Sequence, residues 1–438
     1  MSMPATQSSS DNGSVEKAEP TSSPLAQNEV APSLPPNGGF VAWTQVLGSF
    51  LIMFNNWGLA NGFGTFQSYY ESHRLDAYSP FQIAWIGSLQ LFLLFTVGVF
   101  TGPLFDRGHF RVLNATGSFL MVFGMMMTSI AHTYWQTILA QGVCIGVGMG
   151  FLWTPAVAIC AQYFTTRRAI AIGLAACGTA VGGLLYPVIF TQLIDKVGYG
   201  WSVRIMGFVC LATLIPVNII MVPLKQTTRR RSFFSFGMLR EPHSFFMCWG
   251  ICIGFMGLFV PLYYIGTYAE AVAHMRHSLA SYLFSIINGA LSLRLVFNFL
   301  ADRVGVGNVI WPACAATSIL AYSWIAIDTD GSIIAFCVLY GVASGTSISL
   351  VPSLVPSMTE DMSEIGSRLG VVFLFAGFGA LVGNPIGGAL LANHNTRSHF
   401  LRLQLWSGST MAVAAVCLLL SSLFWKKHLA RKISDIQA

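Results

Sequence analysis

One arginine of the chain lies well inside a long apolar stretch. Arg294 belongs to the run of residues 279–300, about two-thirds of the way along it. A guanidinium near the centre of a bilayer costs roughly 2.5–3.5 kcal/mol, so we expect this side chain to face the protein interior. Its planar fork of donors matches a carboxylate in bidentate geometry. Arg294 is therefore a candidate for binding an organic anion, and reaching the nearer membrane surface is the alternative.

Further polar and aromatic side chains on apolar stretches could contact the same molecule. Asn56 and Asn61 are five positions apart, which places them roughly 140° apart around a helix. They therefore share no narrow face, and hydrogen bonds between helices explain them equally well. The remaining candidates are Trp57, Tyr264 and Thr346. Placement in the interfacial aromatic belt is the simpler interpretation for Tyr264, and close packing is the simpler one for Thr346.

Two short segments place a carboxylate beside basic side chains. A carboxylate between guanidinium groups at helix ends can form ion pairs that hold one conformation and break in another. We therefore predict a conformational latch, while anchoring of the loops by basic residues is the simpler alternative. The members of the predicted latch are Asp106, Arg107, Arg111, Asp302 and Arg303.

Groups typical of enzymes and metal sites are missing from the apolar stretches. By our limits no Asp, Glu or His lies within any of them, so an intramembrane enzyme is not expected. The nine cysteines lie in apolar runs without metal-ligand spacing, so we predict packing residues and no metal. No G-x-x-x-x-G-K-[ST] segment occurs, so we predict no direct use of ATP and no cofactor.

The composition indicates that lipid surrounds most of the chain. Of 438 residues, 9% are charged and 54% are hydrophobic, whereas soluble domains carry about 25% charged residues. So few charges cannot cover a water-soluble surface of this size. This excludes a cytosolic enzyme, a nucleic-acid-binding protein and a secreted disulfide scaffold.

Twelve apolar stretches of about 20 residues follow one another, each of the length that crosses a bilayer. The predicted fold is therefore an all-α integral membrane protein with twelve transmembrane helices. Residues 1–38 are polar and rich in Ser, Pro and Glu, and we predict a disordered tail there. We place the spans at 40–64, 82–103, 112–131, 136–162, 169–194, 201–223, 244–268, 279–300, 308–327, 333–356, 368–392 and 404–425, with a second tail at 426–438.

Basic residues are distributed unequally between the loops of the two sides. Sixteen of the 23 Lys and Arg lie on the side of the termini and five on the other, with two inside spans. The positive-inside rule then places both termini in the cytoplasm. The basic linker 224–243 separates an N-terminal half, 39–223, from a C-terminal half, 244–425.

The two halves resemble each other in three places. Asp106 and Asp302, each followed by Arg, are 196 positions apart. Residues 141–143 and 340–342 are 199 apart, as are residues 64–71 and 263–270. Nearly equal offsets indicate an internal repeat, and repeated halves with a site between them are common in secondary transporters.

The loop of residues 102–111 resembles the G-x-x-x-D-R-x-G-R-R/K signature of the major facilitator superfamily, from which His109 and Phe110 depart. Most of the chain is also similar to the fungal branch of the monocarboxylate porter family. This resemblance rests on residues 36–39 with Trp43, 56–64, 66–70, 85–88, 140–142, 162–164 with 167–169, 182–183 with Pro187, and 383–388. It implies alternating access in the plasma membrane and small organic anions or exported metabolites as substrates.

Arg294 falls on the position of that family's substrate-binding arginine. The lysine and aspartate that handle the proton in the animal branch fall on Asn61 and Ala290. Direct proton symport is therefore disfavoured. Any coupling to protons would have to use carboxylates at helix ends, such as Glu71, Glu270, Asp106 and Asp302.

These observations predict a secondary active or facilitative transporter of a small organic acid or acidic secondary metabolite, with export favoured. Its partners are that small molecule and the lipid bilayer, with no nucleic acid and no ATP. One alternative is a proton-coupled symporter for monocarboxylate uptake. Another is a nutrient receptor built on a transporter scaffold, which would usually carry a long signalling extension, whereas only about 13 residues follow the last span.

Overall fold

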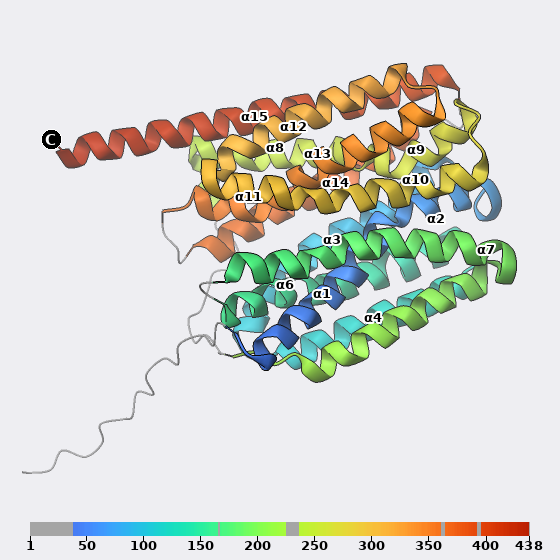
Figure 1. Ribbon diagram of the computed structural model, residues 1–438, viewed down its shortest axis with the longest axis horizontal. Coiled ribbons are helices and arrows are strands. Elements are labelled where there is room, and N and C mark those ends of the chain that lie inside the picture. Colours follow the sequence, from blue (N-terminus) through green and yellow to red (C-terminus); the bar gives the residue numbers. More distant parts are fainter. Residues whose placement is uncertain (1–37, 165–166, 225–235, 361–363, 392–395, 438) are drawn as a thin grey trace, which may run out of the picture. The chain divides into compact units, whose positions relative to one another are not determined.

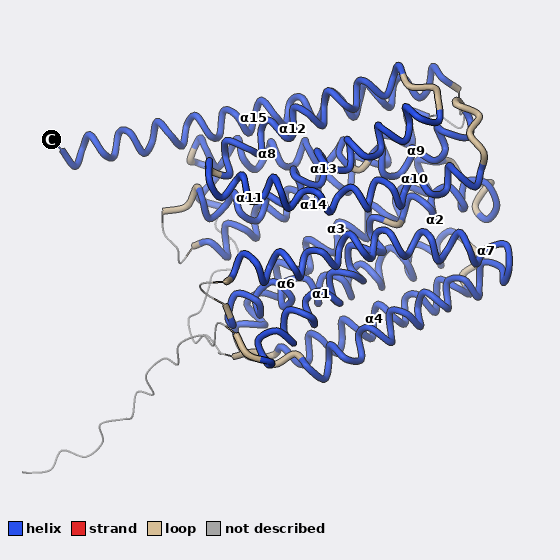
Figure 2. Tube along the Cα trace, viewed as in Figure 1, coloured by secondary structure: helices blue, strands red, loops and turns tan. Residues whose placement is uncertain are grey.

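The computed structural model describes residues 38–437 except 165–166, 225–235, 361–363 and 392–395. In that part of the chain, all regular structure is helical, as Figure 2 shows. This confirms the predicted all-α class. The predicted tail at 1–38 and the basic part of the predicted linker, 225–235, lie almost entirely outside the described residues.

The N-terminal half begins with a helical path that extends past the predicted first span. Its parts are α1 (Phe40–Asn61), α2 (Phe63–Tyr69) and the π-helical turn η1 (Tyr70–Arg74). Next come α3 (Pro80–Asp106), α4 (Phe110–Ile130), and α5 (Tyr134–Thr137) with η2 (Ile138–Ile145) and α6 (Gly146–Tyr163). Finally, α7 (Arg168–Ile220) contains two predicted spans. They are separated at Gly198, whose φ of 75° is readily adopted only by glycine.

The C-terminal half follows the short helix η3 (Phe236–Arg240) and contains six more spans. Two of them are broken into segments: α8 (Pro242–Leu258) with α9 (Val260–Ala271), and α10 (His277–Ala290) with η4 (Leu291–Leu293) and α11 (Arg294–Val304). The remaining spans are α12 (Val306–Ser323) with η5 (Trp324–Ala326), α13 (Asp330–Ser357), α14 (Ile365–Leu391) and α15 (Arg397–Gln437). The last helix therefore continues through the predicted tail.

Nine helices of the described residues are long and apolar enough to cross a membrane, and α7 accounts for two spans. The first predicted span does not meet these criteria, and the eighth includes positions whose side chains lie outside the described part. α1 is 22 residues long but contains Asn55, Asn56 and Asn61, which lower its hydropathy. The eighth span is divided at η4, next to Arg294.

The helices run alongside one another (Figure 1), and we name the two ends of the bundle after residues of the first helical path. α1 begins at the Phe40 end, and η1 lies at the Glu71 end. Three helix pairs join the halves: α3 with α14, α7 with α10, and α2 with α9. Glycines permit this close approach, because a side chain at Gly64 would collide with the Leu262 carbonyl, and one at Gly388 would lie 2.6 Å from the Phe81 nitrogen.

Candidate substrate site between the two halves

Arg294 lies at the boundary between the halves. It is the first residue of α11, directly after the tight turn η4, and its side chain is 6% exposed. Its Nη2 donates to the carbonyl oxygen of Ala176 on α7, at 3.1 Å. Within the described residues, no carboxylate forms an ion pair with it. The structure therefore places a buried guanidinium between the halves, and no carboxylate among the described residues neutralises it.

Asn56 and Gln90 form a small polar group around Met149 in the N-terminal half. Asn56 Nδ2 donates to the Met149 carbonyl at 2.9 Å, and Gln90 Nε2 lies 3.4 Å from the Met149 sulfur. The amide oxygen of each side chain is buried and has no hydrogen-bond partner in the described residues. Buried acceptors of this kind are costly unless a donor reaches them, so a ligand hydroxyl or amide is a natural partner.

Five aromatic rings, here called the aromatic layer, connect the two halves beside this polar group. Trp57 lies edge-on to Trp153 and Phe95, with ring centroids 5.5 and 5.9 Å apart. Phe95 in turn contacts Phe255 and Phe373 of the other half, each at 5.7 Å. The layer offers flat apolar surfaces to a molecule that enters between the halves.

The other predicted binding residues lie at different places. Tyr264 is 0% exposed and donates to the Asn384 carbonyl at 3.2 Å, so its ring does not lie on the surface of the bundle. Asn61 is buried and its Oδ1 has no partner in the described residues. Thr346 donates to Val342 of its own helix at 2.8 Å, which agrees with a packing role.

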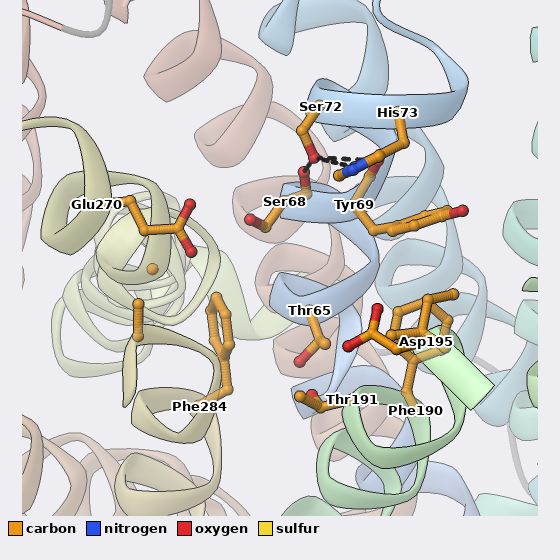
Figure 3. Close-up of a pocket in the computed structure, with 13 residues that line it drawn as sticks. Thr65, Ser68, Tyr69, Ser72, His73, Phe190, Thr191, Asp195, Glu270 and Phe284 are labelled. Carbon is orange, nitrogen blue, oxygen red and sulfur yellow. Dashed lines mark hydrogen bonds between the residues drawn. The ribbon is translucent and has the colours of Figure 1, made fainter. Parts of the chain in front are cut away.

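A cavity of about 360 Å³ opens at the Glu71 end (Figure 3). Glu270 of α9 and Asp195 of α7 lie on opposite sides of it, and the aromatic rings of Phe190 and Phe284 line its walls. None of the predicted substrate-binding residues lines this cavity. The two carboxylates make it unsuitable as the main site for an anion.

The predicted latch residues lie at the Phe40 end. Arg107 and Arg111 are exposed, and the side chain of Asp106 lies outside the described part. Asp302 is exposed as well, and the guanidinium of Arg303 lies 4.5 Å from the Phe299 ring centroid. Among the described side chains, these four form no ion pair with one another. A latching role therefore stays a prediction.

A different charge cluster occupies this end. Arg368 of α14 makes two hydrogen bonds to Glu241, at 2.7 and 2.8 Å, and a third to Glu364 at 3.0 Å. Burial opposes ionisation of Glu241, but the hydrogen bonds from Arg368 and Ser244 outweigh it and hold the pKa below its ordinary value. In the sequence, Arg368 is one basic residue among 23, and nothing in a single sequence shows that residues 241 and 368 meet.

The comparison with protein families settles the class. The family model of the Major Facilitator Superfamily matches residues 39–362.

The chain belongs to the major facilitator superfamily.

Several fungal proteins resemble it over most of their length. The MFS-type transporter dbaD of Emericella nidulans is 39% identical over 380 residues, covering 86% of this chain and 85% of that protein. The Aspyridones efflux protein apdF of the same fungus is 34% identical, covering 87% and 77%. The Agnestins efflux protein AgnL12 of Paecilomyces divaricatus is 34% identical, covering 94% and 95%.

A solved structure shows the same superfamily fold. The crystal structure of a point mutant of the nucleoside transporter NupG matches with a TM-score of 0.69 at 13% identity, covering 87% of this chain and 99% of that one. This confirms the twelve-helix fold in two six-helix halves. At such low identity, the likeness concerns the fold alone.

Proposed function

We propose that this superfamily member exports a small acidic secondary metabolite by alternating access, with Arg294 binding the acid group. Two similar fungal proteins are named as efflux proteins, for aspyridones and for agnestins, which supports export. The two halves would rock about the region between them, as repeated transporter halves do. The sequence motifs further support membership in the fungal branch of the monocarboxylate porter family.

The main support for an acidic substrate is the buried guanidinium of Arg294. Arg294 is buried between α7 and α11, and in the described residues it has a carbonyl partner but no carboxylate. A buried charge without a counter-ion is strongly unfavourable, so an anion that enters between the halves gains much of the missing interaction. The aromatic layer, in turn, favours a substrate with an apolar or aromatic body.

We further propose that the protein resides in the plasma membrane with both termini in the cytoplasm. The excess of basic residues on the side of the termini supports this orientation. The Glu71 end would then face the outside.

The test compares culture media of the native host and of a strain that lacks the gene. We expect an acidic metabolite to disappear from the medium of the deletion strain and to return with the wild-type gene. Arg294→Ala should lower its export about thirtyfold, since losing a hydrogen-bonded charge costs about 2 kcal/mol.

Arg204→Ala is the matched control. Arg204 is also partly buried in a span. Its described partners, Ser129 and the Trp201 ring, both belong to the N-terminal half. Unchanged media in the deletion strain, or full export by Arg294→Ala, would overturn the proposal. Uptake of labelled lactate or pyruvate that depends on a proton gradient would favour the symporter instead.

A further inference from the structure

Glu71 lies where the two halves meet at the Glu71 end, beyond the predicted first span. Its Oε1 accepts a hydrogen bond from Gln67 Nε2, on the same helical path, at 2.5 Å. Its Oε2 accepts one from the hydroxyl of Thr267 on α9, in the other half, at 3.4 Å. The carboxyl group thus bridges the halves, and separating α2 from α9 would break the bridge and expose the group to water.

The basic groups nearest in sequence are engaged elsewhere. The Arg74 guanidinium lies 4.1 Å from the Tyr199 ring centroid and donates to the Ala131 carbonyl. His73 stacks on Tyr69 and its Nδ1 bonds the Ser72 hydroxyl at 2.6 Å. In the described residues, neither forms an ion pair with Glu71.

Among the described contacts, none brings a cation to Glu71 from the elements packed against this segment. α3 carries no titratable side chain before Asp106, at its far end. Toward this end, the other described titratable groups on these elements are Tyr263, Tyr264, Tyr268 and Glu270 on α9, Asp195, Lys196, Tyr199 and Arg204 on α7, Arg276 and Tyr282 at the start of α10, and Tyr69 and Tyr70 on the same path as Glu71. None of the basic groups among them forms a described ion pair with Glu71. A carboxylate in this setting has hydrogen-bond donors but no opposite charge to keep it ionised.

Glu71 is half-buried, and protonation is the way such a group avoids a poorly hydrated charge without a counter-ion. Burial raises the pKa of Glu71 from 4.5 to about 7, although the hydrogen bonds from Gln67 and Thr267 act in the opposite direction. When the end opens and water reaches the carboxyl, the pKa returns toward its ordinary value. The closed end therefore binds a proton that the open end releases, and acid favours closure between about pH 7 and pH 4.5.

We propose that Glu71 is a proton-binding site, and that each closure of the Glu71 end takes up one proton from the solution on that side. The carboxylate and the proton become a carboxylic acid, and no other bond forms or breaks. The inference rests on the alternating access of the proposed function. In an exporter, this closure is the return step after release, so acid on the outer side would favour the return and oppose the next opening of that end to the same extent.

The experiment measures the closure itself and needs no substrate. Spin labels are attached to Asp76→Cys and Arg276→Cys, two exposed positions on opposite halves of the Glu71 end, and the protein is placed in lipid nanodiscs. Electron–electron double resonance then gives the populations of short and long distances. We expect the ratio of closed to open protein to rise about seventyfold between about pH 8 and about pH 5.

Glu71→Gln imitates the protonated acid and should stay closed at every pH. Glu270→Gln, a change of the neighbouring carboxylate in the same cavity, should keep the pH dependence. Infrared difference spectra provide a second measurement, since the band of a protonated carboxylic acid should appear on acidification and be absent from Glu71→Gln.

A ratio that does not respond to pH, together with spectra that show no protonated acid, would overturn the proposal. Dependence that survives in Glu71→Gln but disappears in Glu270→Gln would overturn it as well, by moving the site to Glu270. Failure of the export proposal would look different, because unchanged culture media leave the distance measurement intact.

Discussion

At the Glu71 end the two halves touch through backbone and rings, whereas at the Phe40 end the described ion pairs stay within one half. Gly64 meets Leu262, and Phe63 packs on Tyr263 with ring centroids 5.1 Å apart. Further described contacts across the halves join Phe95 to Phe373 and Arg294 to the Ala176 carbonyl. Nearer the Phe40 end, Arg368 binds only partners of the C-terminal half.

This difference indicates which end the conformation seals. Close-packed backbones lose much of their contact energy when a gap of less than an ångström opens. The contact between the halves at the Glu71 end is therefore either fully formed or lost. Charges that find their partners inside one half leave the halves free to move apart. The structure therefore represents the state that is closed at the Glu71 end.

The largest effect is expected from a substitution that forces α2 and α9 apart at the Glu71 end. In Gly64→Ala, the added methyl group would collide with the Leu262 carbonyl and the Phe284 ring. A backbone carbonyl cannot move aside easily, and overpacking of this kind costs up to about 3 kcal/mol, or roughly a hundredfold in the closed population. We expect export to fall by a similar factor and the spin-label distances to shift to the open form.

Gly331→Ala is the control for this substitution. Gly331 has no atom within 4 Å of the added methyl position, so export and distances should match those of the wild type. A Gly64→Ala protein that closes and exports normally would show that α2 and α9 can lie further apart in the closed state than they do in the structure.

The aromatic layer allows a finer test, because its rings also connect the halves. Trp57→Leu keeps the site apolar but removes the ring that contacts Trp153 and Phe95. Ring contacts of this type contribute about 1 kcal/mol, so KM for the identified metabolite should rise about fivefold with little change in kcat. Trp201→Leu, at an exposed tryptophan, should leave both constants unchanged. An unchanged KM in Trp57→Leu would show that the aromatic layer contributes to packing but not to substrate binding.

The sequence was a good guide to the helices and a poor guide to what meets between them. Length and hydropathy predict the spans, and Gly198 marks the break within α7 that separates two of them. Arg294 was recognisable because charge is rare in a span. Phe95, Phe255 and Phe373 were not, since they are three of 33 phenylalanines and only the packing of distant helices brings them together.

The smallest effect concerns the charge cluster at the Phe40 end. Arg368→Gln removes the paired hydrogen bonds to Glu241, whose side chain is 37% exposed. Solvent screening limits the loss to about 1 kcal/mol, a decrease of a few degrees in Tm without loss of closure at the Glu71 end. The pKa of Glu241 is held below its ordinary value, so the wild-type advantage should be present at neutral pH and disappear as the pH falls through that lowered pKa.

Arg303→Gln, at an exposed arginine outside the described ion pairs, should melt like the wild type. Thermal unfolding in detergent at several pH values measures all three proteins. A Tm difference between Arg368→Gln and the wild type that persists in acid would show that Arg368 stabilises α14 by packing rather than by charge.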